Sequence, residues 1–362
     1  MKIIISGMMG PGTLEAKLVP LSIVEKIDDI MFVRKKMGPK FLKTNYVVLP
    51  SLTNIKFFNI LINPILLIRK VLLEKPTLLI SYHIIPYGFF VAFAGLITRT
   101  PYIISQTGLV IQKHAKRKLF RQFLYFIFKY SFQVNCPGTK SVEYWKSIFP
   151  NLEGKFKVLH STIDTGYFKM DEDISKEYDF IFLGGLQSIK NIDMIIHGFA
   201  NLICTNSFST LPKMVIVGSG PEEKQLHALV RDLDLEEHVT FKGFISKPLS
   251  YLQESRFLVM DSDSEGLPTA MMQAMACEVV PVTSLVGNIA DVVSSGKTGF
   301  VHQGKNLKSI SETMKKALQT DNETLAKMKI ECRNLIVNKH SHQFATSKWD
   351  EVLSRLSIIE ST

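Results

Sequence analysis

The chain has 362 residues, of which 46% are hydrophobic and 21% charged, and this balance excludes a disordered or fibrous protein. At about 100–200 residues per domain, the length predicts two domains. The net charge of +10 is uneven: residues 1–170 hold 24 Lys and Arg against 8 Asp and Glu, and residues 171–362 hold 19 against 25. This asymmetry indicates an anionic partner for the first half, either a nucleic acid or an anionic membrane surface.

The cysteines and the N-terminal sequence indicate in which cellular compartment the protein is found. Cys136, Cys204, Cys277 and Cys332 are scattered without a C-x-x-C pair, which disfavours a zinc site or a disulfide framework. The opening sequence MKIIISGMMGPG has an apolar run of only three isoleucines, whereas a signal peptide needs about 7–15 apolar residues. We therefore expect a cytoplasmic protein.

Short apolar runs typical of buried strands alternate with helical stretches in the first half. The predicted strands are 2–6, 45–50, 77–83, 101–106, 132–137 and 155–161, and the clearest predicted helices are 57–76 and 87–98. Residues 77–98 carry no Asp, Glu, Lys or Arg and are nearly long enough for the roughly 20-residue span of a bilayer. Ser81, His83, Pro86 and Gly88 interrupt them, so we favour strand, turn and helix over a transmembrane segment.

A second series begins after a polar segment, 166–178, which we interpret as a linker. The predicted strands are 179–185, 213–220, 239–244, 257–262 and 279–283, the predicted helices are 191–204, 221–233 and 247–254, and two helical stretches close the chain. Alternating strands and helices predict two doubly wound α/β halves. We expect domains over 1–165 and 179–340, a C-terminal helix within 341–362 that packs back on the first domain, and a ligand site in the cleft between the halves.

Glycine-rich turns follow several predicted strands, at 7–12, 184–185, 218–220 and 243. Glycine lets backbone N–H groups approach a phosphate beside a helix N-terminus, although tight turns also use glycine for structural reasons. Lys190 stands just before a predicted helix, where a cation opposes the helix dipole unless it meets an anion held there. The alternative is a solvated surface lysine.

The segment DSDSEGLP, 261–268, ends a strand and begins a helix. Asp261 and Asp263 form a D-x-D pair that could chelate Mg²⁺ or Mn²⁺. We favour Glu265 as the functional acid, because a carboxylate can accept two sugar hydroxyls at once, with the aspartates as loop residues. Gly266 and Pro268 predict a tight turn, after which the free N–H groups of the first helical turn can hold a diphosphate.

The stretch SEGLPTAMMQAMACEVVPV is similar to the signature S-x-x-E-G-x-P-x-x-x-x-E-A-M-A-x-G-x-P-V-V of retaining family 4 glycosyltransferases, also described as glycosyl transferases group 1. Four further segments resemble that family in its order: FLGGLQSIKNIDMII, IVGSGPEEKQL, VTFKGF and GNIADVVSSGKTGFVHQ. The resemblance covers nearly all of residues 179–305. It implies the GT-B fold, in which two Rossmann-like domains face each other across a cleft, the first binding the acceptor and the second the nucleotide sugar.

The resemblance also implies roles for individual residues. Lys190 would bind the donor diphosphate and Glu265 the sugar hydroxyls, as the catalytic pair. The implied donor-binding positions are Gly10, Gly12, Gly184, Gly185, Gly218, Gly243, Gly266, Leu267, Pro268, Thr269 and Gln273. The donor substrate would be a nucleotide-diphosphate sugar, with a UDP-sugar in first place, and no cofactor or metal is implied. Transfer would proceed by front-side attack, with the leaving phosphate taking the acceptor proton.

The chain departs from the family pattern at four places. Gln273 replaces the second acid of the E-x7-E pair, and its carbonyl can still accept ribose hydroxyls, although without charge. Gly185 replaces the arginine that pairs with the diphosphate lysine, and Asn191 replaces the glycine after that lysine. The histidine often found in the first domain is absent around SQTG, 105–108.

The stretch KHAKRKLFRQFLYFIFKY, 113–130, interleaves basic and aromatic residues and predicts a helix. Such a helix can lie at an anionic membrane interface, where each basic residue contributes about 1 kcal/mol. The basic residues assigned to membrane or acceptor contact are Lys113, Lys116, Arg117, Lys118 and Arg121. The alternative is an ordinary domain helix. Nucleic-acid binding is disfavoured, since no recognised module accompanies the charge.

These observations favour a retaining glycosyltransferase that acts on a lipid-linked or membrane-associated glycan acceptor in surface polysaccharide biosynthesis. It would be cytoplasmic and peripheral on the inner face of the cell membrane. The alternative is a non-catalytic GT-B-like subunit that binds a partner or membrane, its donor site altered at Gly185 and Gln273.

Overall fold

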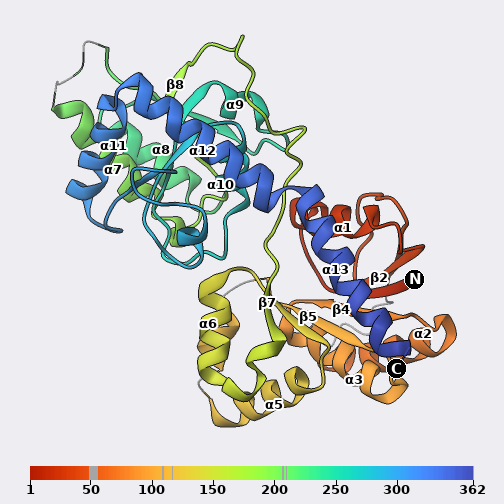
Figure 1. Ribbon diagram of the computed structural model, residues 1–362. Helices are drawn as coiled ribbons and strands as arrows, with labels where there is room; N and C mark the ends of the chain where they lie inside the picture. Colours follow the sequence, from red (N-terminus) through yellow and green to blue (C-terminus); the bar gives the residue numbers. More distant parts are fainter. Residues whose placement is uncertain (49–55, 108–109, 116, 206–207, 209, 362) are drawn as a thin grey trace. The chain divides into compact units, whose positions relative to one another are not determined.

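The computed structural model describes all residues except 49–55, 108–109, 116, 206–207, 209 and 362. It divides into two compact units (Figure 1). Unit 1 comprises residues 1–162 and 342–362, and unit 2 comprises residues 163–341. The chain therefore returns to unit 1 with its last helix.

Unit 1 contains a parallel sheet with strand order β3-β2-β1-β4-β5-β6-β7. The strands are β1 (Lys2–Ser6), β2 (Asp29–Arg34), β3 (Thr44–Val48), β4 (Leu78–Tyr82), β5 (Tyr102–Ser105), β6 (Gln133–Cys136) and β7 (Phe156–Val158). The helices are α1 (Pro11–Ile23), α2 (Lys56–Glu74), α3 (Phe89–Thr98), α4 (Val110–His114), α5 (Lys118–Lys129), α6 (Thr139–Ile148) and α13 (His342–Ser361). Helices cover both faces, which is why the central strands are apolar at nearly every position.

The two faces of this sheet have separate cores. Residues of α2, α3, α5 and α6 pack with one face, around Trp145 and Phe128. Residues of α1 and α13 pack with the other, where Trp349 and Leu353 of α13 are buried. Figure 1 shows α13 lying beside α1.

Unit 2 contains a second parallel sheet with strand order β10-β9-β8-β11-β12-β13. The strands are β8 (Tyr178–Leu183), β9 (Met214–Val217), β10 (Val239–Gly243), β11 (Ser255–Met260), β12 (Val280–Thr283) and β13 (Phe300–Val301). The helices are α7 (Ile192–Cys204), α8 (Glu223–Asp232), α9 (Leu249–Gln253), α10 (Thr269–Ala276), α11 (Leu307–Gln319) and α12 (Asn322–His340). The prediction of two doubly wound α/β halves is confirmed.

Several local predictions need correction. The structure adds β2, α1 and α6, which the apolar patterns did not reveal, and it closes the chain with three helices after β13 rather than two. The helix predicted over 113–130 is interrupted, since α4 ends at His114 and α5 begins at Lys118. Residues 77–98 form β4, a short helical turn over Ile84–Gly88 and α3, so the strand and helix favoured over a membrane span are confirmed. In the described part of the chain, no helix is long and apolar enough to cross a membrane.

The segment interpreted as a linker, 166–178, lies within unit 2. Phe168 is buried in the core of that unit, and Lys176 Nζ donates to the carbonyls of Gln253, at 2.6 Å, and Ser255, at 3.0 Å. These contacts fix the approach of the chain to β8.

In each sheet the strand order reverses beside the first strand of the unit. In unit 1 β1 lies between β2 and β4, and in unit 2 β8 lies between β9 and β11. The loops that leave two adjacent strands then run in opposite directions and open a crevice at the carboxyl ends. Each unit therefore has one such switch point, and the candidate site residues are best described from there.

Candidate functional site

The switch point of unit 2 brings together the two residues expected to be catalytic. Lys190 follows β8 and Glu265 follows β11, and the structure joins them in an ion pair between Lys190 Nζ and Glu265 Oε1. Ser262 Oγ also donates to Glu265 Oε1, at 2.9 Å. The side chains retain 21% and 11% exposure, so both are largely buried, but neither is fully closed off from solvent.

Asn191 connects the loop that carries Lys190 to the loop that carries Glu265. Its backbone is left-handed, with φ 48° and ψ 46°, a conformation that asparagine tolerates better than most residues other than glycine. Its side-chain amide donates to the carbonyl of Asp261, at 2.7 Å, and to Asp263 Oδ1, at 2.8 Å. The residue that replaces the family's glycine therefore keeps the turn and ties the Lys190 loop to the Glu265 loop.

Two substitutions of Asn191 distinguish the effect of its left-handed backbone from the effect of its side-chain hydrogen bonds. Asn191→Gly keeps the left-handed backbone and loses two hydrogen bonds, so we expect a loss of about 1–2 kcal/mol in the free energy of unfolding. Asn191→Ala adds the strain of a left-handed alanine, of order 1 kcal/mol. Urea denaturation of both variants measures the difference, and equal stabilities would show that the backbone conformation is unimportant.

The N-terminus of α10 lies directly after Glu265. Pro268 precedes the helix, no side chain of the described residues caps it, and its first turn holds no acidic residue. The first N–H groups of α10 are thus available to an anion. Leu267 and Pro268 are buried, whereas Thr269 and Gln273, one turn apart, are half-buried and share the outward face of the helix.

Five glycines in the turns of unit 2 differ in what a Cβ would meet. A Cβ on Gly218 would lie 1.8 Å from the carbonyl oxygen of Gly184, and one on Gly220 would lie 2.2 Å from that of Leu186. These glycines let the loops after β8 and β9 touch backbone to backbone. By contrast, a Cβ on Gly185, Gly243 or Gly266 would meet nothing closer than 3.8 Å. Gly243 ends β10, at the sheet edge and two strands from β8.

Asp261 and Asp263 are engaged by the protein itself. Asp261 Oδ2 accepts from the backbone N–H of Lys305, at 3.0 Å, and Asp263 pairs with Lys305 Nζ, at 2.9 Å. Hydrogen bonds from Asn191 and Lys305 lower the pKa of Asp263. Within the described ranges no group of three or more His, Cys, Asp or Glu is placed to hold a metal ion.

A crevice of about 390 Å³ beside Asp263 is lined by Ser188, Asn191, Glu222 and Lys305 among others.

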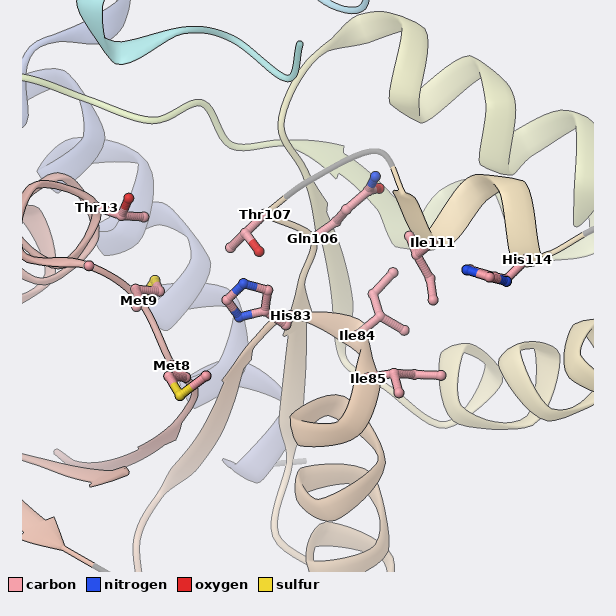
Figure 2. Close-up of a pocket in the computed structure, with 11 residues that line it drawn as sticks. Met8, Met9, Thr13, His83, Ile84, Ile85, Gln106, Thr107, Ile111 and His114 are labelled. Atoms are coloured by element: carbon pink, nitrogen blue, oxygen red, sulfur yellow. The ribbon is translucent and has the colours of Figure 1, made fainter. Parts of the chain in front are cut away.

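The switch point of unit 1 carries a second cavity, of about 600 Å³. It is lined by residues of the loops after β1, β4 and β5 and of α1 and α4, namely Met8, Met9, Gly10, Thr13, His83, Ile84, Ile85, Gln106, Thr107, Ile111 and His114 (Figure 2). Gly10, which the sequence assigned to donor binding, lines this cavity. Gly12 lies in the first turn of α1 and does not line it.

His83 is a residue of this cavity that the sequence patterns did not single out. In the sequence it stands only as an interruption of an apolar run, and the histidine expected around 105–108 is absent. The structure places His83 in the same cavity as Gln106 and Thr107, because β4 and β5 are paired neighbours. The available signal was a histidine directly after a buried strand, where parallel sheets present ligand-binding residues.

The basic residues assigned to membrane or acceptor contact lie along α4 and α5. Lys118 is the first residue of α5, Arg117 precedes it, and Arg121 follows one turn later, all with exposed side chains. Lys113 is in α4, but its side chain is outside the described parts, and Lys116 lies outside the described residues. The aromatic side of α5 packs inward through Phe128, so part of the stretch is an ordinary domain helix.

Comparison with known proteins adds to this geometry. Residues 168–334 match the family described as "Glycosyl transferases group 1". N-acetyl-alpha-D-glucosaminyl L-malate synthase of Bacillus anthracis is 28% identical over 143 residues, which are 37% of this chain and 36% of that protein. A Campylobacter jejuni enzyme named N-acetylgalactosamine-N,N'-diacetylbacillosaminyl-diphospho-undecaprenol 4-alpha-N-acetylgalactosaminyltransferase is 29% identical over 171 residues, 46% of this chain and 45% of its own.

The alignments thus span less than half the length of these two relatives. Among solved structures, Anabaena HepE in complex with UDP has a TM-score of 0.80 over 98% of this chain and 100% of its own, at 15% identity. That likeness concerns the fold. It confirms the expected GT-B architecture of two Rossmann-like domains.

Proposed function

Because residues 168–334 match the family of glycosyl transferases group 1, we propose that the protein is a retaining glycosyltransferase that uses a nucleotide-diphosphate sugar. The observation that carries this proposal is the Lys190–Glu265 pair, which stands beside the uncapped N-terminus of α10 at the switch point of unit 2. A cation, a carboxylate and a row of free N–H groups in one crevice suit a sugar diphosphate.

In the proposed chemistry, each of these groups binds a different part of the donor. Lys190 and the N-terminus of α10 bind the diphosphate and stabilise the charge that develops as it leaves. Glu265 accepts hydrogen bonds from hydroxyls of the transferred sugar. Gln273, on the outward face of α10, accepts from the ribose diol. The acceptor oxygen forms a bond to the anomeric carbon on the face that the diphosphate leaves, and its proton passes to the leaving phosphate.

In this proposal, unit 2 binds the donor and unit 1 binds the acceptor. UDP is the first nucleotide to test, since HepE was solved with UDP. The relative from Campylobacter jejuni is named for a diphospho-undecaprenol substrate, and this supports a lipid-linked glycan as the acceptor, in the assembly of a surface polysaccharide.

The test is nucleotide release from a panel of UDP-, GDP- and ADP-sugars, with a detergent-solubilised lipid extract as acceptor. Release from one donor that is lost in Glu265→Ala would support the enzyme, and unchanged release in EDTA would support a mechanism without a metal. NMR of the product's anomeric proton reports retention. No release and no thermal shift with any nucleotide would favour the alternative, a non-catalytic subunit of the same fold.

We also propose that unit 1 docks on the inner face of the cell membrane. On α5 the exposed residues include Leu119, at 83%, and Phe126, at 50%. The neighbouring α3, whose Phe89 ring lies 5.3 Å from that of Phe123, exposes Phe93, Leu96 and Ile97. Between Glu74 and Glu143 the sequence has no acidic residue and nine basic ones. An apolar face with an unbalanced positive charge suits a bilayer that contains anionic lipids.

Vesicle co-sedimentation tests this surface. We expect binding to vesicles with about 30% anionic lipid, with roughly tenfold weaker binding after Leu119→Ser and Phe126→Ser together, since two apolar anchors are lost. Lys118→Glu with Arg121→Glu should weaken it further and reduce its salt dependence. Ile330→Ser, at an exposed apolar residue of unit 2, is the matched control. Equal binding by control and α5 variants would exclude α5 as the contact.

A further inference from the structure

A buried carboxylate and a buried imidazole face each other in unit 2. Asp261 directly follows β11, and His302 directly follows β13, two strands away in the same sheet. Asp261 Oδ1 lies 3.9 Å from His302 Nδ1, and the two side chains are 1% and 0% exposed. Neither atom has a hydrogen-bond partner among the described residues. Two ionisable groups therefore meet where solvent does not reach them and where an uncompensated charge is costly.

The other ring nitrogen of His302 fixes the tautomer. Nε2 lies 3.1 Å from the carbonyl oxygen of Met260, and because a carbonyl only accepts, Nε2 carries the proton. Nδ1 of the neutral ring then presents a lone pair to the carboxylate of Asp261. Burial lowers the pKa of His302, and the charge of Asp261 opposes this only partly, so the ring is neutral at pH 7. Two acceptors thus face each other, and the pair can take up one proton.

Asp261 connects three loops at the carboxyl ends of the strands. Its Oδ2 accepts from the backbone N–H of Lys305, at 3.0 Å, in the loop after β13. Its main-chain carbonyl accepts from the side chain of Asn191, at 2.7 Å, directly after Lys190. Glu265 follows four residues later in the same loop. A displacement of Asp261 therefore moves the supports of both members of the Lys190–Glu265 pair.

The other charged groups of these loops are paired with each other. Asp263 and Lys305 pair at 2.9 Å across the loops after β11 and β13, and Lys190 of the loop after β8 pairs with Glu265. The loop after β12 contributes Ser284, which carries no charge. The carboxylate is thus the charged group that shifts the titration of the ring.

A proton on Nδ1 changes this contact from two acceptors to a donor and an acceptor. A charge-assisted N–H···O bond is about 2.7–2.9 Å long, so the imidazolium and the carboxylate must approach each other by about 1 Å. Nε2 donates to the carbonyl of Met260 in both protonation states, which holds the ring in place. The approach therefore pulls Asp261 against its hydrogen bonds to Lys305 and Asn191.

We propose that His302 is a positioning residue of the donor crevice: neutral, it leaves Asp261 where it supports the Lys190 and Glu265 loops, and on gaining a proton it draws Asp261 away from Asn191 and weakens donor binding. That the ligand of this crevice is a nucleotide sugar rests on the proposed function. The response to the proton does not, because it follows from contacts within unit 2.

The first test needs no ligand. In NMR spectra of the full chain, the side-chain amide of Asn191 should shift between about pH 7.5 and pH 5, with the same midpoint as the ring of His302. Asn191→Gly and His302→Gln identify the two signals. His302→Gln retains a donor for the carbonyl of Met260 but cannot be protonated in this range, so in this variant the amide should not shift. An amide that does not shift in the wild type overturns the proposal.

The second test measures the Kd of UDP-glucose and the other donors of the panel by calorimetry. A sugar diphosphate has no terminal phosphate to titrate near pH 6, so the profile reports on the protein. Because burial lowers the pKa of His302, the wild-type Kd should rise below the ordinary histidine value of about 6.5, by roughly fivefold or more at about pH 5. His302→Gln should change less than about twofold. A purely structural role would instead raise the Kd of this variant at every pH.

His197→Gln, at a half-buried histidine of α7, is the matched control and should keep the wild-type profile. If His302→Gln also keeps that profile, the positioning role is overturned while donor binding stands. If no donor of the panel binds at about pH 7.5, the proposed function is contradicted. The NMR titration then still decides whether the proton on His302 acts on Asn191.

Discussion

Glu265→Ala is expected to lower kcat/KM for the nucleotide sugar by about 10²–10³-fold, because it removes a preorganised hydrogen-bonding group from the reacting sugar. The carboxylate is only 11% exposed and is already positioned by Lys190 and Ser262. Its loss also leaves the Lys190 ammonium without its partner in a crevice with limited access to water. The effect should fall mainly on kcat if Glu265 interacts more strongly with the transition state than with the bound donor.

A double-mutant cycle with Lys190→Met sharpens this prediction. The two side chains form one ion pair, so the combined loss should be smaller than the product of the single losses. Glu312→Ala, at an exposed acid on α11 that pairs with Lys308, is the matched control and should retain wild-type kinetics. Full activity in Glu265→Ala would contradict the role assigned to this crevice.

Gly218→Ala is expected to lower the free energy of unfolding by roughly 3 kcal/mol or more, since overpacking against rigid backbone adds to a strained φ. The new Cβ would overlap the carbonyl of Gly184, and φ at this position is +152°. Backbone cannot rotate away as a side chain can, so the loops after β8 and β9 must separate. The Lys190 loop begins at Gly184, and donor affinity should therefore fall as well.

Gly266→Ala and Gly185→Ala serve as controls for stability. Neither new Cβ meets an atom closer than 3.8 Å, so each should change the free energy of unfolding by less than about 1 kcal/mol. Urea denaturation should be followed with a probe in unit 2, because a protein of two units need not unfold in one step. If all three variants are equally stable, the contact between the two glycine loops is not a determinant of the fold.

The sequence alone determined the elements whose signals are local. The apolar runs at 77–83 and 257–262 predicted β4 and β11 because a strand buried on both faces must be apolar throughout. Glycine and proline after Glu265 predicted the turn before α10, since those residues restrict or free the backbone locally. β2 was missed because it begins with Asp29 and ends with Arg34, which leaves an apolar run of only four residues.

The tertiary structure decided which of these elements are neighbours. Strand order is set by packing between segments far apart in the chain, and it alone placed Lys190 beside Glu265, 75 residues later. It also showed that Gly218 meets backbone, a reason for glycine that no local pattern reveals.

The position of His83 in the cavity of unit 1 was the feature that the sequence could predict least. Its place beside Gln106 and Thr107 follows from the pairing of β4 with β5, which a linear reading does not contain. The sequence thus indicated which residues are candidates for binding a sugar nucleotide, because side-chain chemistry is local. The fold determined where they meet, because the register and order of a parallel sheet depend on contacts between distant residues.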